Sequence, residues 1–188
     1  MENLIVIQMQ FTEKPIIYKT FILVLKMSKK ESNLENLKKD YKEIQKKYKL
    51  PDFEKLNKDF NIEKSTESET DYLIREVRRL IAEKFSNYLR FVETLLNPIN
   101  APMSVFSIVK TLGTEEKSKL TEIYKKLLRN EIDHLELEIS FSEEKEAEFI
   151  KEAYEMWLEI QKDFIEIIKT IKNNWNNKLE KNNKGYFG

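Results

Sequence analysis

The chain has 188 residues, no cysteine, and 33 basic and 33 acidic residues, so its formal net charge is zero. The absence of cysteine excludes disulfides, thiolate metal sites and thiol catalysis, and it fits a reducing, cytoplasmic location. Neutral charge argues against a dedicated nucleic-acid coat, which needs a basic excess to release counterions. Only three glycines and four prolines occur, which favours long helices. We therefore expect an all-α protein without a cofactor.

Residues 1–26 form an apolar N-terminal segment that differs from the rest of the chain. Lys19 interrupts its longest apolar stretch, and the segment is too short and too charged to span a bilayer, which takes about 20 apolar residues. It also lacks the small-residue cleavage site of a signal peptide. Two interpretations stay open. Either strands near 4–11 and 16–25 pair as a β-hairpin, or translation begins at Met27 and the segment is not part of the natural protein.

A helical arm is predicted over residues 27–64. Its apolar residues recur at spacings of three and four, the coiled-coil pattern of a helix that packs on another helix. Because this narrow seam lies beside the N-terminus, we expect it to bind a second copy of the chain or another helical protein through Leu34, Leu37, Tyr41, Ile44 and Tyr48. Pro51 should end this helix. A short helix should follow, with Phe53, Leu56 and Phe60 facing inward.

The bundle core is predicted over residues 65–178, and its first long helix over about 70–96. Apolar residues at helical spacing give that helix a buried stripe: Ile74, Val77, Ile81, Phe85, Tyr88, Val92 and Leu95. The helix also carries most of the arginines of the chain: Arg75, Arg78, Arg79 and Arg90. Acidic residues predominate over 131–166. The arginines therefore either pair with acidic flanks of neighbouring helices or form a basic patch for a phosphate or an acidic partner.

A short helix over 103–112 is expected to stop at Gly113 in the left-handed conformation, with Thr114 capping the next helix. That next helix should turn six apolar side chains inward: Leu120, Ile123, Leu127, Ile132, Leu135 and Ile139. Alternation over residues 134–141 is also a strand signature. The 4-3-4 spacing of Leu128, Ile132, Leu135 and Ile139 nevertheless favours a helix.

After a break near residues 140–142 the last long helix begins, and the short connection makes it an antiparallel neighbour of the helix before it. Its predicted inner face comprises Phe149, Ala153, Tyr154, Trp157, Ile160, Phe164, Ile167, Ile168, Ile171 and Trp175. Residues 179–188 contain little core-forming sequence, and we expect them to be a flexible tail.

His134 is the one histidine of the chain and the focus of its candidate chemistry. Glu131 and His134 are spaced i, i+3 and match one Glu-x-x-His element of a di-iron helical bundle. Such a site uses that element twice. Because a single histidine cannot supply the second element, we expect no metal site.

The stretch "RNEIDH" resembles the Arg-x4-6-His motif of HEPN-type ribonucleases, whose helical bundles pair two such motifs across a dimer. The resemblance implies His134 as the acid/base, Arg129 as the group that stabilises developing phosphate charge, and Asn130 as polar support. Positions five apart on a helix differ by about 140° around its axis, so Arg129 and His134 do not share a face. The motif is short, and no other feature of the chain accompanies it.

A broader resemblance covers about Leu34 to Trp175. The stretches "KYKLPDFEKLNKDFNIEK" and "EAEFIKEAYEMWLEI" are similar to small uncharacterised helical proteins of archaea, a likeness that implies no activity. We expect a bundle of three long helices plus short helices, with a structural or protein-interaction role. A dimeric, metal-independent ribonuclease is the alternative; membrane binding and other nucleic-acid binding are not expected.

Overall fold

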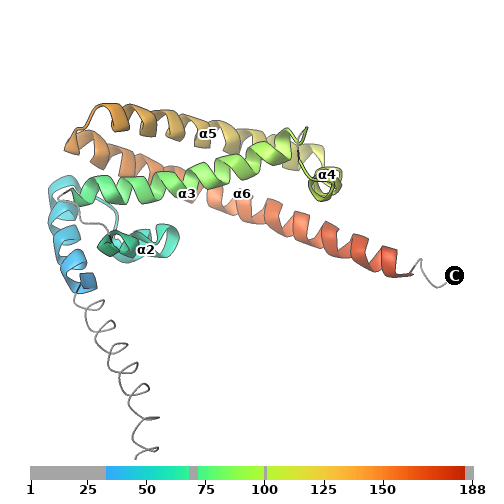
Figure 1. Ribbon diagram of the computed structural model, residues 1–188, viewed down its shortest axis with the longest axis horizontal. Coiled ribbons are helices and arrows are strands. Elements are labelled where there is room, and N and C mark those ends of the chain that lie inside the picture. The colour runs from blue at the N-terminus through green and yellow to red at the C-terminus, as the bar shows by residue number, and fades with distance from the viewer. Residues whose placement is uncertain (1–32, 68–71, 100, 185–188) are drawn as a thin grey trace, which may run out of the picture.

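The computed structural model describes residues 33–67, 72–99 and 101–184 (Figure 1). All regular structure in these ranges is helical, which confirms the predicted all-α class. The elements in chain order are a helix over residues 33–48, α2 (Phe53–Phe60), the 3-10 helix η1 (Ile62–Glu67), α3 (Leu73–Leu96), α4 (Met103–Val109), α5 (Thr114–Ile139) and α6 (Glu143–Lys184). The hairpin predicted within residues 1–26, and the alternative start at Met27, lie outside the described residues.

The three long helices α3, α5 and α6 contain 24, 26 and 42 residues and form a bundle. In this bundle α5 runs antiparallel to the other two helices (Figure 1). The start of α3, the end of α5 and the start of α6 therefore meet at one end of the molecule. None of the described helices is both long enough and apolar enough to cross a membrane.

The helix over residues 33–48 ends before Pro51, as the sequence predicts. Lys49 takes the left-handed conformation, with φ of 57°. The Leu50 N–H then donates to the Gln45 carbonyl at 3.2 Å. This is the bonding pattern of a Schellman cap, which satisfies a carbonyl that the helix leaves unpaired.

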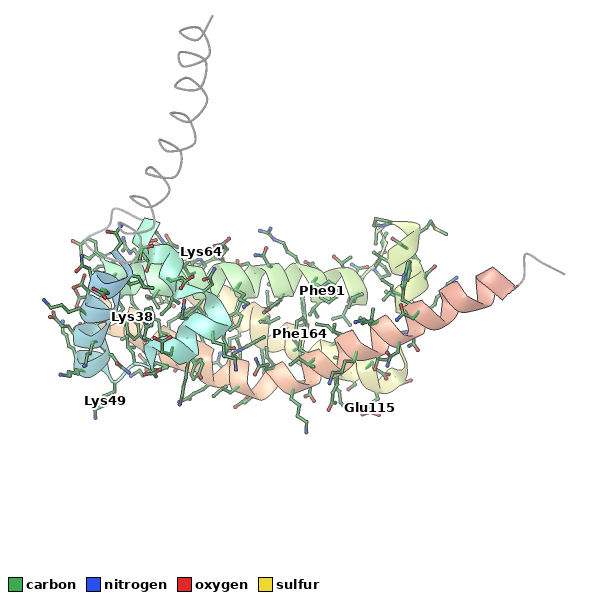
Figure 2. The ribbon with its side chains drawn as sticks, turned by 90° about the horizontal axis from the view of Figure 1, so that it is seen from below. Lys38, Lys49, Lys64, Phe91, Glu115 and Phe164 are labelled. Atoms are coloured by element: carbon green, nitrogen blue, oxygen red, sulfur yellow. The ribbon has the colours of Figure 1, made fainter. Side chains whose placement is uncertain are left out.

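This first helix and α2 cover one end of the bundle, as Figure 2 shows. Their buried apolar side chains join the core of the three long helices: Leu37, Tyr41, Leu50, Phe53, Leu56 and Phe60. Leu34, Ile44 and Tyr48 are partly buried against the same core. The predicted interface seam is therefore packed largely within its own chain. A role for it in binding another helix remains a prediction that depends on the exposed edges of those last three residues.

The predicted stripe of α3 faces the core. Six of its members are buried: Ile74, Val77, Ile81, Phe85, Val92 and Leu95. Tyr88 is partly buried and stacks on Trp157 of α6, with ring centroids 5.4 Å apart and planes 9° apart. A charged residue, Arg78, is buried in phase with this apolar stripe.

The inward face of α5 differs from the prediction. Its buried residues are Leu120, Ile123, Leu127, Asn130 and Leu137. With the half-buried His134 they form one repeat at alternating spacings of three and four. Ile132, Leu135 and Ile139 were predicted to face inward and are exposed. The prediction failed because the inward repeat continues through two polar residues, while the neighbouring apolar residues follow a different phase.

The start of α5 also differs from the prediction. Gly113 has φ of −75° and ψ of −179°, an extended conformation, and it is itself the N-cap of α5. The predicted left-handed cap is therefore wrong, and Thr114 is the first helical residue rather than the cap. The preceding helix, α4, ends earlier than predicted, at Val109.

The last helix, α6, is longer than predicted. It continues through Lys184, so most of the predicted tail is helical. Residues 179–184 contain no glycine or proline, and Gly185 follows them, which removes the usual causes of helix termination before that point. Ile168 and Trp175 were assigned to the inner face but are 43% and 37% exposed.

Candidate functional site

A cluster of charged side chains, with Arg78 and Glu146 buried at its centre, lies at the end of the bundle where α3 begins, α5 ends and α6 begins. The Arg78 guanidinium donates from Nε to Oε2 of Glu146 at 2.5 Å, and both side chains are 0% exposed. It also donates from Nη2 to Oε1 of Glu138 at 2.7 Å and from Nη1 to Nδ1 of His134. The arginine of α3 is thus bound by acceptors from both of the other bundle helices, α5 and α6. Burial of the two charges is tolerated because they pair with each other and with further hydrogen bonds.

Two more arginines of α3, Arg79 and Arg75, lie beside the glutamates of this cluster. Arg79 donates to both oxygens of Glu138, at 3.0 Å from Nε and 3.0 Å from Nη2. These bonds, with those from Arg78, lower the pKa of Glu138 to about 2. Arg75 lies with its guanidinium carbon 4.2 Å from the ring centroid of Phe141 and its Nε 3.7 Å from Glu146.

The predicted basic patch is therefore divided. Arg75, Arg78 and Arg79 lie beside glutamates of α5 and α6, which is the first of the two alternatives derived from the sequence. Arg90 is exposed farther along α3. The phase of Arg78 was the available sequence signal: it lies four residues after Ile74 and three before Ile81, within the apolar stripe.

His134 serves this cluster as a hydrogen-bond acceptor. An arginine has only donors, so Nδ1 of His134 must carry its lone pair toward Arg78, and the proton of the neutral ring lies on Nε2. Burial, and then the charge of Arg78, lower the pKa of His134 below its ordinary value. The available lone pair of the neutral imidazole is thus already engaged. A general base for RNA cleavage needs that lone pair free.

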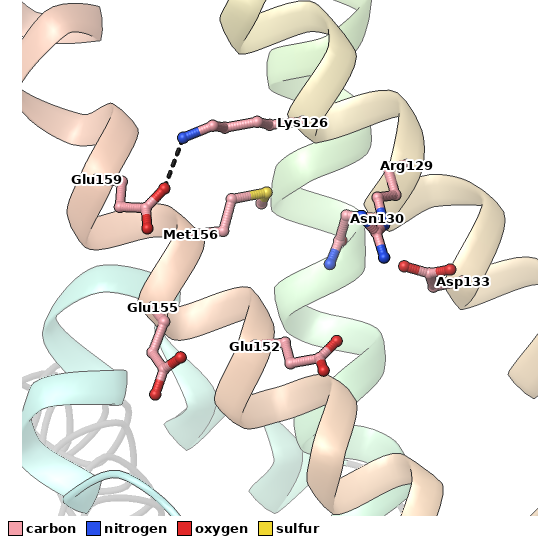
Figure 3. Close-up of a pocket in the computed structure, with 8 residues that line it drawn as sticks. All are labelled: Lys126, Arg129, Asn130, Asp133, Glu152, Glu155, Met156 and Glu159. Atoms are coloured by element: carbon pink, nitrogen blue, oxygen red, sulfur yellow. Dashed lines mark hydrogen bonds and ion pairs between the residues drawn. The ribbon is translucent and has the colours of Figure 1, made fainter.

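Of the other members of the predicted ribonuclease motif, Asn130 belongs to the same inward seam of α5 as His134, whereas Arg129 lies about 140° around the helix from His134. Arg129 and Asn130 line a groove of about 250 Å³ between α5 and α6, together with Asp133 and Glu152 (Figure 3). Lys126 and Glu159 close one end of this groove with an ion pair of 2.5 Å. His134 contacts Arg78 of α3 instead. The structure therefore does not bring Arg129 and His134 together within one chain.

Asn130 is a polar residue in the inward seam of α5. It is 7% exposed, and its Oδ1 has no hydrogen-bond partner among the described residues.

In the part of the chain that the structure describes, no group of three or more histidines or acids is arranged to hold a metal ion.

The second candidate site is an exposed apolar surface, which we name the outer α5 face. It consists of Leu128, Ile132, Leu135 and Ile139, which are 37%, 59%, 54% and 89% exposed. At about 100° per residue this row lies roughly 135° around the helix from the inward seam. Single exposed apolar residues are ordinary, but four at heptad spacing on one face make this row a candidate interaction surface. The 4-3-4 pattern is visible in the sequence, but three of its four residues, Ile132, Leu135 and Ile139, were predicted to face the core.

Comparisons with known proteins identify no relative: no family model, no curated protein and no solved structure matches the chain. Neither resemblance drawn from the sequence gains support from them. The function therefore has to be argued from the surfaces of this molecule.

Proposed function

We propose that this chain is a protein-interaction module, and that its outer α5 face binds a helix of another polypeptide. The observation that carries the proposal is the exposure of four branched apolar side chains in a 4-3-4 row. This is the spacing of a coiled-coil seam, in which each side chain inserts between residues of a facing helix. The inward seam of α5 already serves its own bundle, so the helix has two apolar faces and its own chain covers one of them.

The free energy available from this face is sufficient to support binding. The four side chains together expose more area than two whole aliphatic residues. Covering one such side chain stabilises a complex by about 1.5–3 kcal/mol, so the face contributes roughly 4–7 kcal/mol from this side alone. Association costs on the order of 4–15 kcal/mol in lost freedom. A weak or moderate complex is therefore expected, with the partner contributing a similar area.

The buried charged cluster supports this surface. Glu138 and His134 lie on the same helical turns as Leu135 and Ile139, and both are bonded to Arg78 of α3. The half of α5 that carries the outer face is thus fixed against the bundle. A binding surface on a rigid helix loses little conformational entropy when it is covered.

A matched pair of substitutions tests the proposal. Leu135 on the outer α5 face and Leu158 on α6 are both 54% exposed, so Leu135→Glu and Leu158→Glu make the same chemical change at the same exposure. Circular dichroism should show that both variants fold. Each is then used as bait in an extract of cells that express the chain naturally, and co-purifying chains, tagged copies of the protein included, are quantified by mass spectrometry.

We expect Leu135→Glu to lose at least about tenfold of the material that binds the wild type, because a carboxylate in a covered apolar seam must be desolvated. Leu158→Glu should bind as the wild type does. Equal binding by the two variants, or no specific binding by the wild type, contradicts the proposal.

A further inference from the structure

We infer that the helix that covers the outer α5 face is α5 of a second copy of this chain, packed antiparallel about a two-fold axis. The inference rests on the proposed function, because it names the partner of that same surface. It is argued from the spacing of the row, from the lysine that continues it and from the charges on its flanks.

The spacing of the outer α5 face is the same in both directions. From Leu128 to Ile139 the steps are four, three and four residues, and this order is unchanged when the helix is reversed. An axis midway between Ile132 and Leu135 therefore places Leu128 against Ile139 of the second copy. The same axis places Ile132 against Leu135 of the second copy. All four positions are filled, as an isologous interface requires.

Lys125 distinguishes the antiparallel arrangement from the parallel one. It lies three residues before Leu128 and continues the row toward the start of α5. In a parallel pair it would face Lys125 of the second copy inside the seam. In the antiparallel pair the facing helix ends at about Leu128, because α5 ends at Ile139. Lys125 then stays in solvent and keeps its 2.8 Å ion pair with Glu122.

The flanking charges favour the same arrangement. Arg129 and Glu136 each follow a seam residue on the same flank. Antiparallel packing brings Arg129 opposite Glu136 of the second copy, and the symmetry repeats this pair. Parallel packing lacks this opposite-charge pair. It brings Glu131 toward Glu136 of the second copy, a like-charge contact that the 3.2 Å ion pair of Glu136 with Lys145 reduces but does not replace with an attraction.

Antiparallel packing also brings Glu131 toward Glu138 of the second copy, and the symmetry repeats this pair of acids. Their repulsion is reduced within each chain. Arg78 and Arg79 bind Glu138 at 2.7 Å and 3.0 Å, and the Ser86 hydroxyl donates to Glu131 at 2.5 Å. The row spans about three helical turns, or roughly 16 Å. A contact this short buries less area than a standard interface of about 1,200–2,000 Å². We therefore expect a dimer that dissociates on dilution.

Disulfide trapping tests the arrangement, and the chain suits it because it contains no cysteine. Leu128→Cys and Ile139→Cys replace surface residues that are 37% and 89% exposed, and each is made in the full chain with a tag of different mass. The two variants are oxidised with copper phenanthroline, separately and mixed. A mixture of Leu158→Cys with Ile139→Cys measures random collision. Reduction with dithiothreitol should reverse every product.

We expect the Leu128→Cys and Ile139→Cys mixture to give at least about tenfold more disulfide-linked heterodimer than the control mixture, and each variant alone to give only the control level. Efficient linking of Leu128→Cys to itself and of Ile139→Cys to itself overturns the antiparallel arrangement. If no combination links above control while the outer α5 face still captures a protein from extract, the inference fails and the proposed function stands. If neither linking nor capture occurs, both fail.

Discussion

Removal of the Arg78 side chain should destabilise the fold more than any surface change. Arg78 and Glu146 are both 0% exposed, and the Arg78 Nε is 2.5 Å from the Glu146 carboxylate. In Arg78→Met the aliphatic stem is largely retained while the charge is lost. Glu146 then keeps only Arg75 beside it, at 3.7 Å. A buried carboxylate with so poor a partner is expected to cost about 3–5 kcal/mol.

The opposite change should cost less. In Glu146→Leu the guanidinium of Arg78 keeps Glu138 at 2.7 Å and the ring nitrogen of His134. Because two of its acceptors remain, we expect a loss of about 2–3 kcal/mol, below the range for a fully orphaned charge. The double variant leaves no buried charge unpaired at this position. Replacement of a buried pair by apolar residues is often close to neutral, so we expect the double variant to lie within about 2 kcal/mol of the wild type.

Urea unfolding followed by far-ultraviolet circular dichroism measures the three free energies of unfolding, and fluorescence of the buried Trp157 provides a second probe. The coupling between the two sites is the sum of the single losses minus the loss in the double variant, and it should exceed about 3 kcal/mol. A loss of less than about 1 kcal/mol in Arg78→Met would show that Glu146 does not depend on Arg78 for its charge to stay buried. Two single losses that simply add would show that the two side chains are not coupled.

Four further predictions concern α5. Burial and the Arg78 charge lower the pKa of His134 in the folded chain. The folded state therefore binds fewer protons than the unfolded state below pH about 6.5, and the free energy of unfolding should fall as the pH drops below that value. In urea titrations at several pH values this decline should be shallower for His134→Gln than for the wild type, and an equal decline contradicts the prediction. The pKa of Glu138, lowered from 4.5 to about 2, adds stability that is lost as the pH falls from about 4.5 toward 2, and Glu138→Gln should remove that part of the acid sensitivity. Asn130→Leu removes a buried side-chain oxygen that has no hydrogen-bond partner. The free energy of unfolding should therefore rise by about 1–2 kcal/mol. A fall in the free energy of unfolding would show that Asn130 is required for packing. The purified wild-type chain should cleave RNA no faster than the His134→Ala variant does. RNA cleavage that is lost in His134→Ala supports the ribonuclease alternative.

Much of the helical architecture was predictable because apolar periodicity and helix breakers agree. Pro51 marks a real helix end, and the stripe from Ile74 to Leu95 faces the core. The prediction of α5 was less successful, since its inward repeat contains Asn130 and His134. A prediction based only on the spacing of apolar residues therefore assigns the outer α5 face to the core in the second half of this helix. Only tertiary packing decides which of two competing rows is covered.

The candidate site was predictable only in part. His134 was identified because it is the one histidine, but its partner is Arg78 from a distant helix and not Arg129 from its own helix. Nothing in the spacing along α5 indicates that contact. Arg78 could have been recognised by its phase among Ile74, Val77 and Ile81, where a charge requires a buried acid. The sequence did not indicate that Glu146 would supply it, because many glutamates of α6 are equally placed.

Sedimentation velocity over a concentration series measures self-association through the outer α5 face. The chain has a mass of 22.6 kDa, and we expect the wild type and Leu158→Glu to shift from this mass toward twice this mass as the concentration rises. Leu135→Glu should stay at the monomer mass at every concentration. A wild type that remains monomeric throughout, or a Leu135→Glu variant that associates as strongly as the wild type, contradicts self-association through the outer α5 face.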